Sequence, residues 1–197
     1  MTEVNSYGEN NVLMTAVNVG EYLKTLEVPY CFIGGVSYLR WGEPRQTVDV
    51  DGVLFTDFGR EKFFAETLTT EYQSRIDNPI EFAIQNRIVL LQTTSGIGVD
   101  LSLGGLPYEQ RMIDRSSDWK IPQHGTIRTC SAEDLVVLKT FASRPQDWID
   151  VEKVIIRQDA KLDRELIKTE LQPLLNLKEE PEAMDDLAKL FTKHMPI

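Results

Sequence analysis

The sequence predicts an α/β protein of the α+β type, with a mixed sheet flanked by helices and a C-terminal helical subdomain after it. Over the first two thirds of the 197 residues, short apolar runs rich in β-branched residues alternate with segments of helical periodicity. Two pairs of runs are joined by short turns, as in β-hairpins. Only helical patterns follow. We therefore expect one domain over residues 1–130 and a helical subdomain packed on it over residues 131–197.

The first domain is predicted from short elements in a regular order. Asn78-Pro79 indicates a helix start, because the first turn of a helix does not need the N–H that proline lacks. The turn "SGIG" separates two apolar runs and indicates a hairpin. Helices are expected over 11–26, 36–42 (a turn or two), 60–68, 78–85 and 107–115, and strands over 30–33, 46–55, 71–76 (weak), 87–94, 99–103 and a smaller hairpin over 119–130.

The last third is predicted to form four helices. Ser131 is a suitable N-cap, and the acidic Asp134 follows in the first turn. Pro145 breaks the first of these helices and suits the first turn of the next. The expected ranges are 131–143, 145–158, 163–177 and 181–195.

Composition excludes several classes of protein. The net charge of −10 and the pI near 4.7 argue against a broad basic face that coats nucleic acid. They leave Mg²⁺-bound nucleotide as a compatible ligand, because the metal offsets charge on both sides. With only two histidines, a His-rich zinc site is excluded.

Other features predict a cytoplasmic protein with no membrane partner. The N-terminal "MTEVNSYGENNVL" lacks the basic-then-apolar pattern of a secretory signal, and no apolar run approaches the roughly 20 residues that span a bilayer. Cys31 and Cys130 adjoin apolar segments, so we expect buried, reduced thiols.

Two carboxylates interrupt the apolar run over 46–55. Residues two apart in a strand point to the same face, so Asp49 and Asp51 project side by side. Such neighbours repel each other and lose hydration, and a divalent cation resolves both costs. The structural alternative is a solvated strand end, or a turn at "DVDG".

A third carboxylate, Asp100, lies between Val99 and Leu101 in a later predicted strand. If its strand neighbours that of Asp49 and Asp51, three carboxylates converge, an arrangement that matches two-metal phosphoryl transfer. The alternative is a hydrogen-bonded residue of an edge strand.

Gly34-Gly35 stands at the end of one apolar run and opens a short helix. Glycines there let backbone amides approach a ligand closely, and a helix N-terminus favours anions. A phosphate cradle is thus one interpretation, and a tight strand–helix turn is the other. Gly-Gly, a short helix and then Asp-x-Asp is a far more specific pattern than the glycine pair alone.

The segment "IGGVSYLRWGEPRQTVDVD" resembles the signature of the DNA polymerase beta-like nucleotidyltransferase superfamily. That signature is a Gly-Gly or Gly-Ser turn, a helix, an Asp-x-Asp and a third Asp on a later strand. The segment "EDLVVLKTFASRPQDWIDVEKVI" is similar to the AbiEii-type bacterial nucleotidyltransferases, which include abortive-infection and toxin–antitoxin proteins. The resemblance spans roughly residues 30–160.

The resemblance implies roles for single residues. Asp49 and Asp51 would hold Mg²⁺, and Asp100 would hold a second metal or take the proton of the attacking hydroxyl. Lys139 would neutralise phosphate charge at the catalytic site. The implied nucleotide-binding set is Gly34, Gly35, Ser37, Thr47, Lys139, Arg144, Asp147 and Asp150. The structural alternatives are a solvated Lys139, a helix-end cation at Arg144 and a first-turn cap at Asp147.

The chain departs from the family pattern at three places. Gly35 stands where many members have Ser, and Thr140 stands where Leu is common. The family's Lys/Thr/Arg motif between the acidic strands has only loose candidates, Arg75 and Arg87.

The resulting hypothesis is a Mg²⁺-dependent nucleotidyltransferase that moves a nucleoside monophosphate from an NTP to an acceptor hydroxyl and releases pyrophosphate. The acceptor would be a tRNA, a protein or a small molecule. By resemblance, the protein could be the toxin of a toxin–antitoxin pair, with an antitoxin protein as its partner. The alternative is a catalytically silent module of the same fold that binds nucleotide or a protein.

Overall fold

The computed structural model describes the backbone of residues 6–195 and the side chains of residues 11–195. It confirms the predicted fold class. The chain forms two compact units, the first comprising residues up to Val36 and Gln46–Cys130, the second Ser37–Arg45 and the residues from Ser131 onward. Among the described helices, none has both the length and the apolar character that a membrane span needs.

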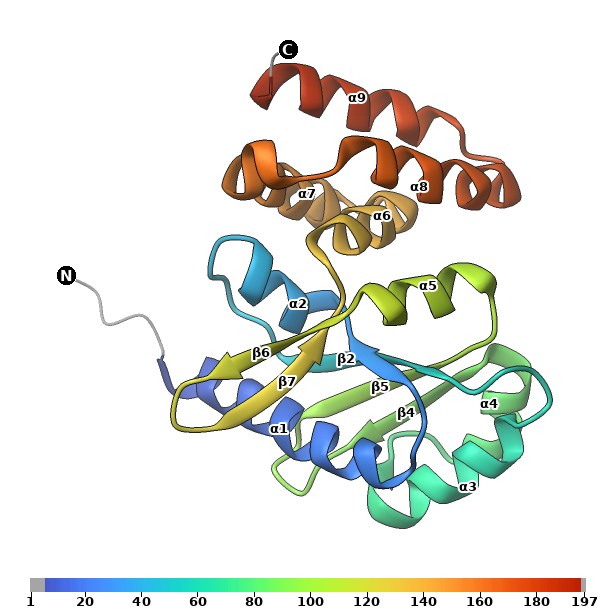
Figure 1. Ribbon diagram of the computed structural model, residues 1–197. Helices are drawn as coiled ribbons and strands as arrows, with labels where there is room; N and C mark the ends of the chain where they lie inside the picture. The colour runs from blue at the N-terminus through green and yellow to red at the C-terminus, as the bar shows by residue number, and fades with distance from the viewer. Residues whose placement is uncertain (1–5, 196–197) are drawn as a thin grey trace. The chain divides into compact units, whose positions relative to one another are not determined.

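The first unit is built on a seven-stranded mixed sheet (Figure 1). Only the neighbours β2–β5 and β1–β7 run parallel. From one edge to the other, the strands are β3 (Gln73–Ser74), β4 (Ile88–Gln92), β5 (Gly98–Gly104), β2 (Asp49–Phe55), β1 (Tyr30–Phe32), β7 (Gly125–Thr129) and β6 (Ser117–Ile121).

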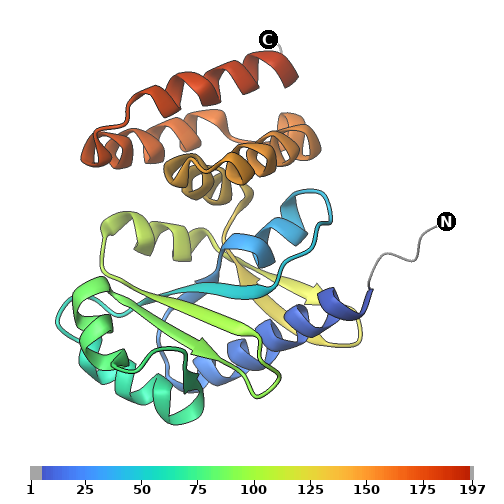
Figure 2. The ribbon, with the colours of Figure 1, turned by 180° about the vertical axis from the view of Figure 1, so that it is seen from behind.

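Helices α1 (Ser6–Thr25) and α3 (Glu61–Glu71) contribute to the main core on one face of this sheet. The core takes the alternate, inward residues of the central strands, such as Val50, Val99 and Leu101, which have no exposed surface. Helix α4 (Pro79–Asn86) lies with α3 beside β4, as Figure 2 shows from behind. Helix α5 (Pro107–Arg115) contacts β2.

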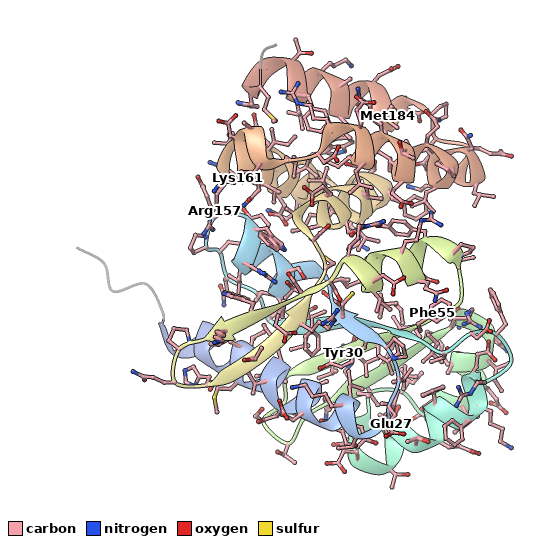
Figure 3. The ribbon with its side chains drawn as sticks, viewed as in Figure 1. Glu27, Tyr30, Phe55, Arg157, Lys161 and Met184 are labelled. Carbon is pink, nitrogen blue, oxygen red and sulfur yellow. The ribbon has the colours of Figure 1, made fainter. Side chains whose placement is uncertain are left out.

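Tyr30 ties α1 to the sheet. Its side chain leaves β1 (Figure 3), and its hydroxyl donates a hydrogen bond to the carbonyl of Gly20 in α1 at 3.0 Å. Burial, with smaller effects of nearby charges, raises the pKa of Tyr30 to about 12, so the hydroxyl keeps its proton and remains a donor at neutral pH.

The second unit contains α6 (Ala132–Ala142), α7 (Pro145–Gln158), a short 3₁₀ turn (Asp159–Lys161), α8 (Arg164–Lys178) and α9 (Glu182–His194). Each helix contributes apolar residues to its interior, among them Leu135, Val151, Leu171 and Leu187, all without exposed surface. The hydroxyl of Ser131 accepts the amide of Asp134 at 3.0 Å, which confirms the predicted N-cap of α6.

The segment 37–45 belongs to this unit because α7 holds it. Helix α2 (Gly34–Trp41) starts in the first unit and ends in the second. At the C-terminal end of α7, Arg157 (Figure 3) donates a hydrogen bond to the carbonyl of Gly42, and Gln158 donates one to the carbonyl of Trp41 at 2.7 Å. Lys153 of α7 pairs with Glu43 at 3.0 Å.

Candidate active site

The three predicted carboxylates lie on neighbouring strands. β2 and β5 pair in parallel, and Asp51 stands directly opposite Asp100. Asp49, two residues before Asp51, stands opposite Gly98 and shares the same face of the sheet. All three side chains are partly exposed, whereas the alternate residues are buried in the core on the other face. The alternation therefore places one acidic face over one apolar face.

The carboxylates are not gathered into a ready-made metal cluster. Among the side chains that the structure describes, no group of three or more His, Cys, Asp and Glu residues is close enough to hold a metal ion. A cationic side chain is the partner of one of the three instead: the guanidinium of Arg75 forms an ion pair with Asp100.

The Gly-Gly turn closely approaches this acidic face. Gly34 has a φ of +55°, in the left-handed region that favours glycine, and a Cβ there would overlap the carboxylate of Asp51. A Cβ on Gly35 would overlap the hydroxyl of Thr47. The two glycines thus make room for one metal-binding candidate and one hydroxyl at the start of α2.

This packing gives a physical reason for the departure at Gly35. A serine there would collide with Thr47, whose own hydroxyl fills the space beside the turn. Thr47 is 6% exposed and Ser37 is fully buried. The hydroxyl that lies against the turn is therefore that of Thr47, and Ser37 is in a position that favours a packing role.

In the second unit, four charged side chains form a network around the buried Asp150. Asp150 has no exposed side-chain surface and accepts two parallel hydrogen bonds from the guanidinium of Arg45, at 2.9 and 2.7 Å. The ammonium of Lys139 lies 2.6 Å from Asp150 and 3.0 Å from Asp147. The side-chain amide of Gln146 donates a further bond to Asp150 at 2.9 Å.

The network keeps Asp150 charged. Burial by itself raises the pKa of Asp150, but the hydrogen bonds from Arg45, Lys139 and Gln146 outweigh it and bring the pKa below its ordinary value. The same hydrogen bond from Arg45 to Asp150 raises the pKa of the guanidinium. Asp150 is therefore an anion at neutral pH that holds two cations in fixed places.

Asp147 and Arg144 mark the start of α7. The carboxylate of Asp147 accepts the backbone N–H of Arg144 at 3.3 Å, which is the capping role that the sequence offered as an alternative for Asp147. The same carboxylate accepts from Lys139, so capping and charge pairing coexist. The side chain of Arg144 is 78% exposed, and it is a helix N-cap residue rather than a C-terminal cation.

Two cations in these arrangements were only loose candidates from the sequence, Arg75 for the family's basic motif and Arg45 as a residue just before the Asp-x-Asp that could line the site. Arg45 and Arg75 each pair with a predicted acidic residue, 105 and 25 residues away along the chain. An arginine near the Asp-x-Asp was the only sequence signal for Arg45. Arg87, the other loose candidate, is a packing residue at the far end of β5: it pairs with Glu61 and donates to the carbonyl of Leu103.

No protein-family model matches the sequence, and no curated protein matches it. Solved structures do match. An antigenic nucleotidyltransferase-like protein from Paracoccidioides brasiliensis has a TM-score of 0.51 and 16% identity, over 90% of this chain and 93% of that one. This chain shares the fold of that nucleotidyltransferase-like protein. The solution structure of the antibiotic-resistance factor ANT(2'')-Ia has a TM-score of 0.54 and 11% identity, over 90% of this chain and 98% of that one.

Structural similarity at such low sequence identity establishes the fold alone. The reaction has to be inferred from the chemistry of the site. The AbiEii subtype, inferred from the segment over 133–155, stays a prediction.

Proposed function

We propose that the protein is a metal-dependent nucleotidyltransferase that moves a nucleoside monophosphate from an NTP to an acceptor hydroxyl, with release of pyrophosphate. One observation carries the proposal: Asp49, Asp51 and Asp100 share one face of two paired strands, and the backbone of Gly34 lies against the carboxylate of Asp51. The acidic face would attract the positively charged metal, and the backbone amides at the glycine turn would attract the negatively charged triphosphate.

Mg²⁺ suits the donor set, because it prefers hard oxygen ligands, which all three carboxylates supply. Asp49 and Asp51 would hold it, and Asp100 would complete a two-metal site or accept the proton of the attacking hydroxyl. When bound, the metal would neutralise charge that develops on the transferred phosphoryl group. The apolar face behind the three carboxylates keeps their strands fixed while a ligand binds.

The start of α2 would bind the triphosphate. Backbone amides at a helix N-terminus attract anions, and the two glycines allow close approach. The hydroxyl of Thr47, packed against Gly35, would donate to a phosphate oxygen where other members of the superfamily use serine.

By resemblance, Lys139 and Arg144 of the second unit are predicted to neutralise phosphate charge of the nucleotide. Lys139 is held by two carboxylates, so it is a positioned ammonium rather than a freely moving one. Arg144 is exposed and would contact phosphate with its planar fork. In this proposal Asp147 and Asp150 act through the cations that they hold.

The test is isothermal titration of each NTP, with and without Mg²⁺, into the wild type, Asp49→Asn and Asp118→Asn. Asp118 is a matched control, because it is an exposed carboxylate of the same unit on β6. We expect metal-dependent binding of at least one NTP by the wild type and by Asp118→Asn, and its loss in Asp49→Asn. Equal binding by all three proteins, or binding that ignores the metal, would contradict the proposal.

A second candidate is a catalytically silent module of the same fold. The ion pair between Arg75 and Asp100 favours it, because a third carboxylate already neutralised by protein need not meet a metal. Metal-independent NTP binding without transfer to any acceptor would support this alternative. The toxin role, the antitoxin partner and a tRNA acceptor rest on the resemblance alone and stay predictions.

A further inference from the structure

Arg75 and Asp100 belong to one row of residues that runs across neighbouring strands of the sheet. The backbone N–H of Arg75, just after β3, donates to the carbonyl of Leu90 in β4 at 2.9 Å. Leu90 stands directly opposite Asp100 in β5, and Asp100 stands opposite Asp51 in β2. These four residues form one row across four strands.

The ion pair bridges a distance that only a long side chain covers. Neighbouring strands are about 4.8 Å apart, so the backbone of Arg75 lies about 10 Å from that of Asp100. Its side chain crosses β4 to reach the carboxylate, and the pairs on either side fix the register. The sheet thus directs this guanidinium to Asp100.

The pair is nevertheless suited to exchange. The side chain of Arg75 is 35% exposed and that of Asp100 is 24% exposed, so water competes for both. Ion pairs of this exposure contribute little net stability. A divalent cation bound at Asp49 and Asp51 would attract Asp100 and repel the guanidinium at the same time.

We propose that Arg75 is a built-in counter-cation of Asp100 that competes with the metal. This inference rests on the proposed function. In the nucleotide-free protein, Arg75 occupies Asp100 and keeps the affinity for free metal low. Asp100 would exchange the guanidinium for a metal bound together with a nucleotide, and would join the site only then. Metal and nucleotide therefore bind with positive coupling, and the protein does not hold a catalytic metal in the absence of substrate.

The proposal predicts that removing the counter-cation tightens the binding of free metal. The probe is Mn²⁺ without nucleotide, followed by isothermal titration or by the loss of its free electron-spin-resonance signal. An exposed ion pair corresponds to about a fivefold change in affinity, so Arg75→Gln should bind Mn²⁺ about five times more tightly than the wild type. In the Arg75→Gln background, Asp100→Asn should abolish this gain, as a double-mutant cycle would show.

Two variants control for charge and folding. Lys62→Gln removes one positive charge from the same unit, at an exposed pair with Glu66 of 3.7 Å, and should leave Mn²⁺ affinity unchanged. Arg75→Lys keeps the charge at the row and should retain an affinity close to that of the wild type, with a folded circular-dichroism spectrum. If Arg75→Gln does not fold, the comparison is made with Arg75→Lys. Weaker Mn²⁺ binding by Arg75→Lys than by the wild type overturns the proposal, and equal or slightly tighter Mn²⁺ binding supports it.

Three outcomes separate this inference from the proposed function. Equal Mn²⁺ affinities in Arg75→Gln and Lys62→Gln, with metal-dependent NTP binding intact, would overturn the counter-cation alone. Weaker NTP binding by Arg75→Gln with unchanged Mn²⁺ affinity would also overturn it, and would make Arg75 a phosphate ligand. No binding of Mn²⁺ or of Mn²⁺ with NTP by any of the proteins would remove the proposed function and the inference together.

Discussion

Asp100 in the sheet and Asp150 in the helical unit are both carboxylates paired with arginine, yet their surroundings differ. Asp150 is fully buried and accepts from Arg45, Lys139 and Gln146. Asp100 is 24% exposed, and its ion pair is with Arg75. A carboxylate with several partners and no water is fixed in place, whereas one with an exposed cation can exchange it for another. Burial therefore separates a structural ion pair from one that a ligand can open.

The largest expected effect tests the functional side of this comparison. Asp51→Asn should lower nucleotide transfer by about a thousandfold, or about 4 kcal/mol of barrier, because it removes a proposed metal ligand. The folded state should lose no stability, since like-charge repulsion on the acidic face falls. The measurement is incorporation of labelled NTP into total cell RNA and protein, with thermal unfolding alongside. A variant that unfolds while Asp118→Asn does not would assign Asp51 a structural role instead.

The next effect tests the structural side. Asp150→Asn leaves Arg45 and Lys139 without their shared anion and should lower the free energy of unfolding by about 3 kcal/mol. Asp100→Asn should change it by less than about 1 kcal/mol, because its pair is exposed. Urea unfolding of the two variants measures the difference. Similar losses of unfolding free energy in both variants would contradict the conclusion that burial separates the two ion pairs.

The pH dependence of that loss sharpens the comparison. The folded-state pKa of Asp150 is lowered, so its contribution is fully present above its unfolded pKa of about 3.9 and is lost as the pH falls through the folded value. The stability difference between wild type and Asp150→Asn should therefore be constant from pH 7 to 5 and shrink below about pH 4. Urea unfolding midpoints of the two proteins over this pH range measure the stability difference. A stability difference that grows as the pH falls would contradict the prediction.

A smaller effect concerns the glycine turn. Gly34 and Gly59 both have positive φ, +55° and +84°, but only at Gly34 would a Cβ meet other atoms, those of Asp51. Gly59→Ala should cost about 1 kcal/mol of stability from its backbone alone. Gly34→Ala should cost more and should also abolish metal-dependent NTP binding, because it displaces the Asp51 carboxylate. Retained binding in Gly34→Ala would separate the turn from the site.

Local signals predicted most of the elements. The hairpin β4–β5, the helix over 107–115 and the Ser131 cap are all found, since each depends on residues close in sequence. The first helix begins at Ser6 rather than at residue 11, because its first turns carry polar residues that give no apolar period.

Local sequence signals could not predict which distant elements pair with each other. Nothing local fixes β2 beside β5 in parallel, since the contact joins segments almost fifty residues apart and depends on the whole sheet. The partners of the acidic residues, Arg75 and Arg45, follow from that assembly and from α7 in the same way. The acidic residues themselves were visible because carboxylates are out of place in an apolar strand.

The chain passes between its two units three times, after Val36, after Arg45 and after Cys130. The helical unit is consequently not a continuous piece of sequence. A fragment that begins at Ser131 would carry Asp150 without Arg45, and would lack the segment that Arg157 and Gln158 hold. The helical unit could therefore be exchanged between related proteins only if the nine residues Ser37–Arg45 were exchanged together with the segment that begins at Ser131.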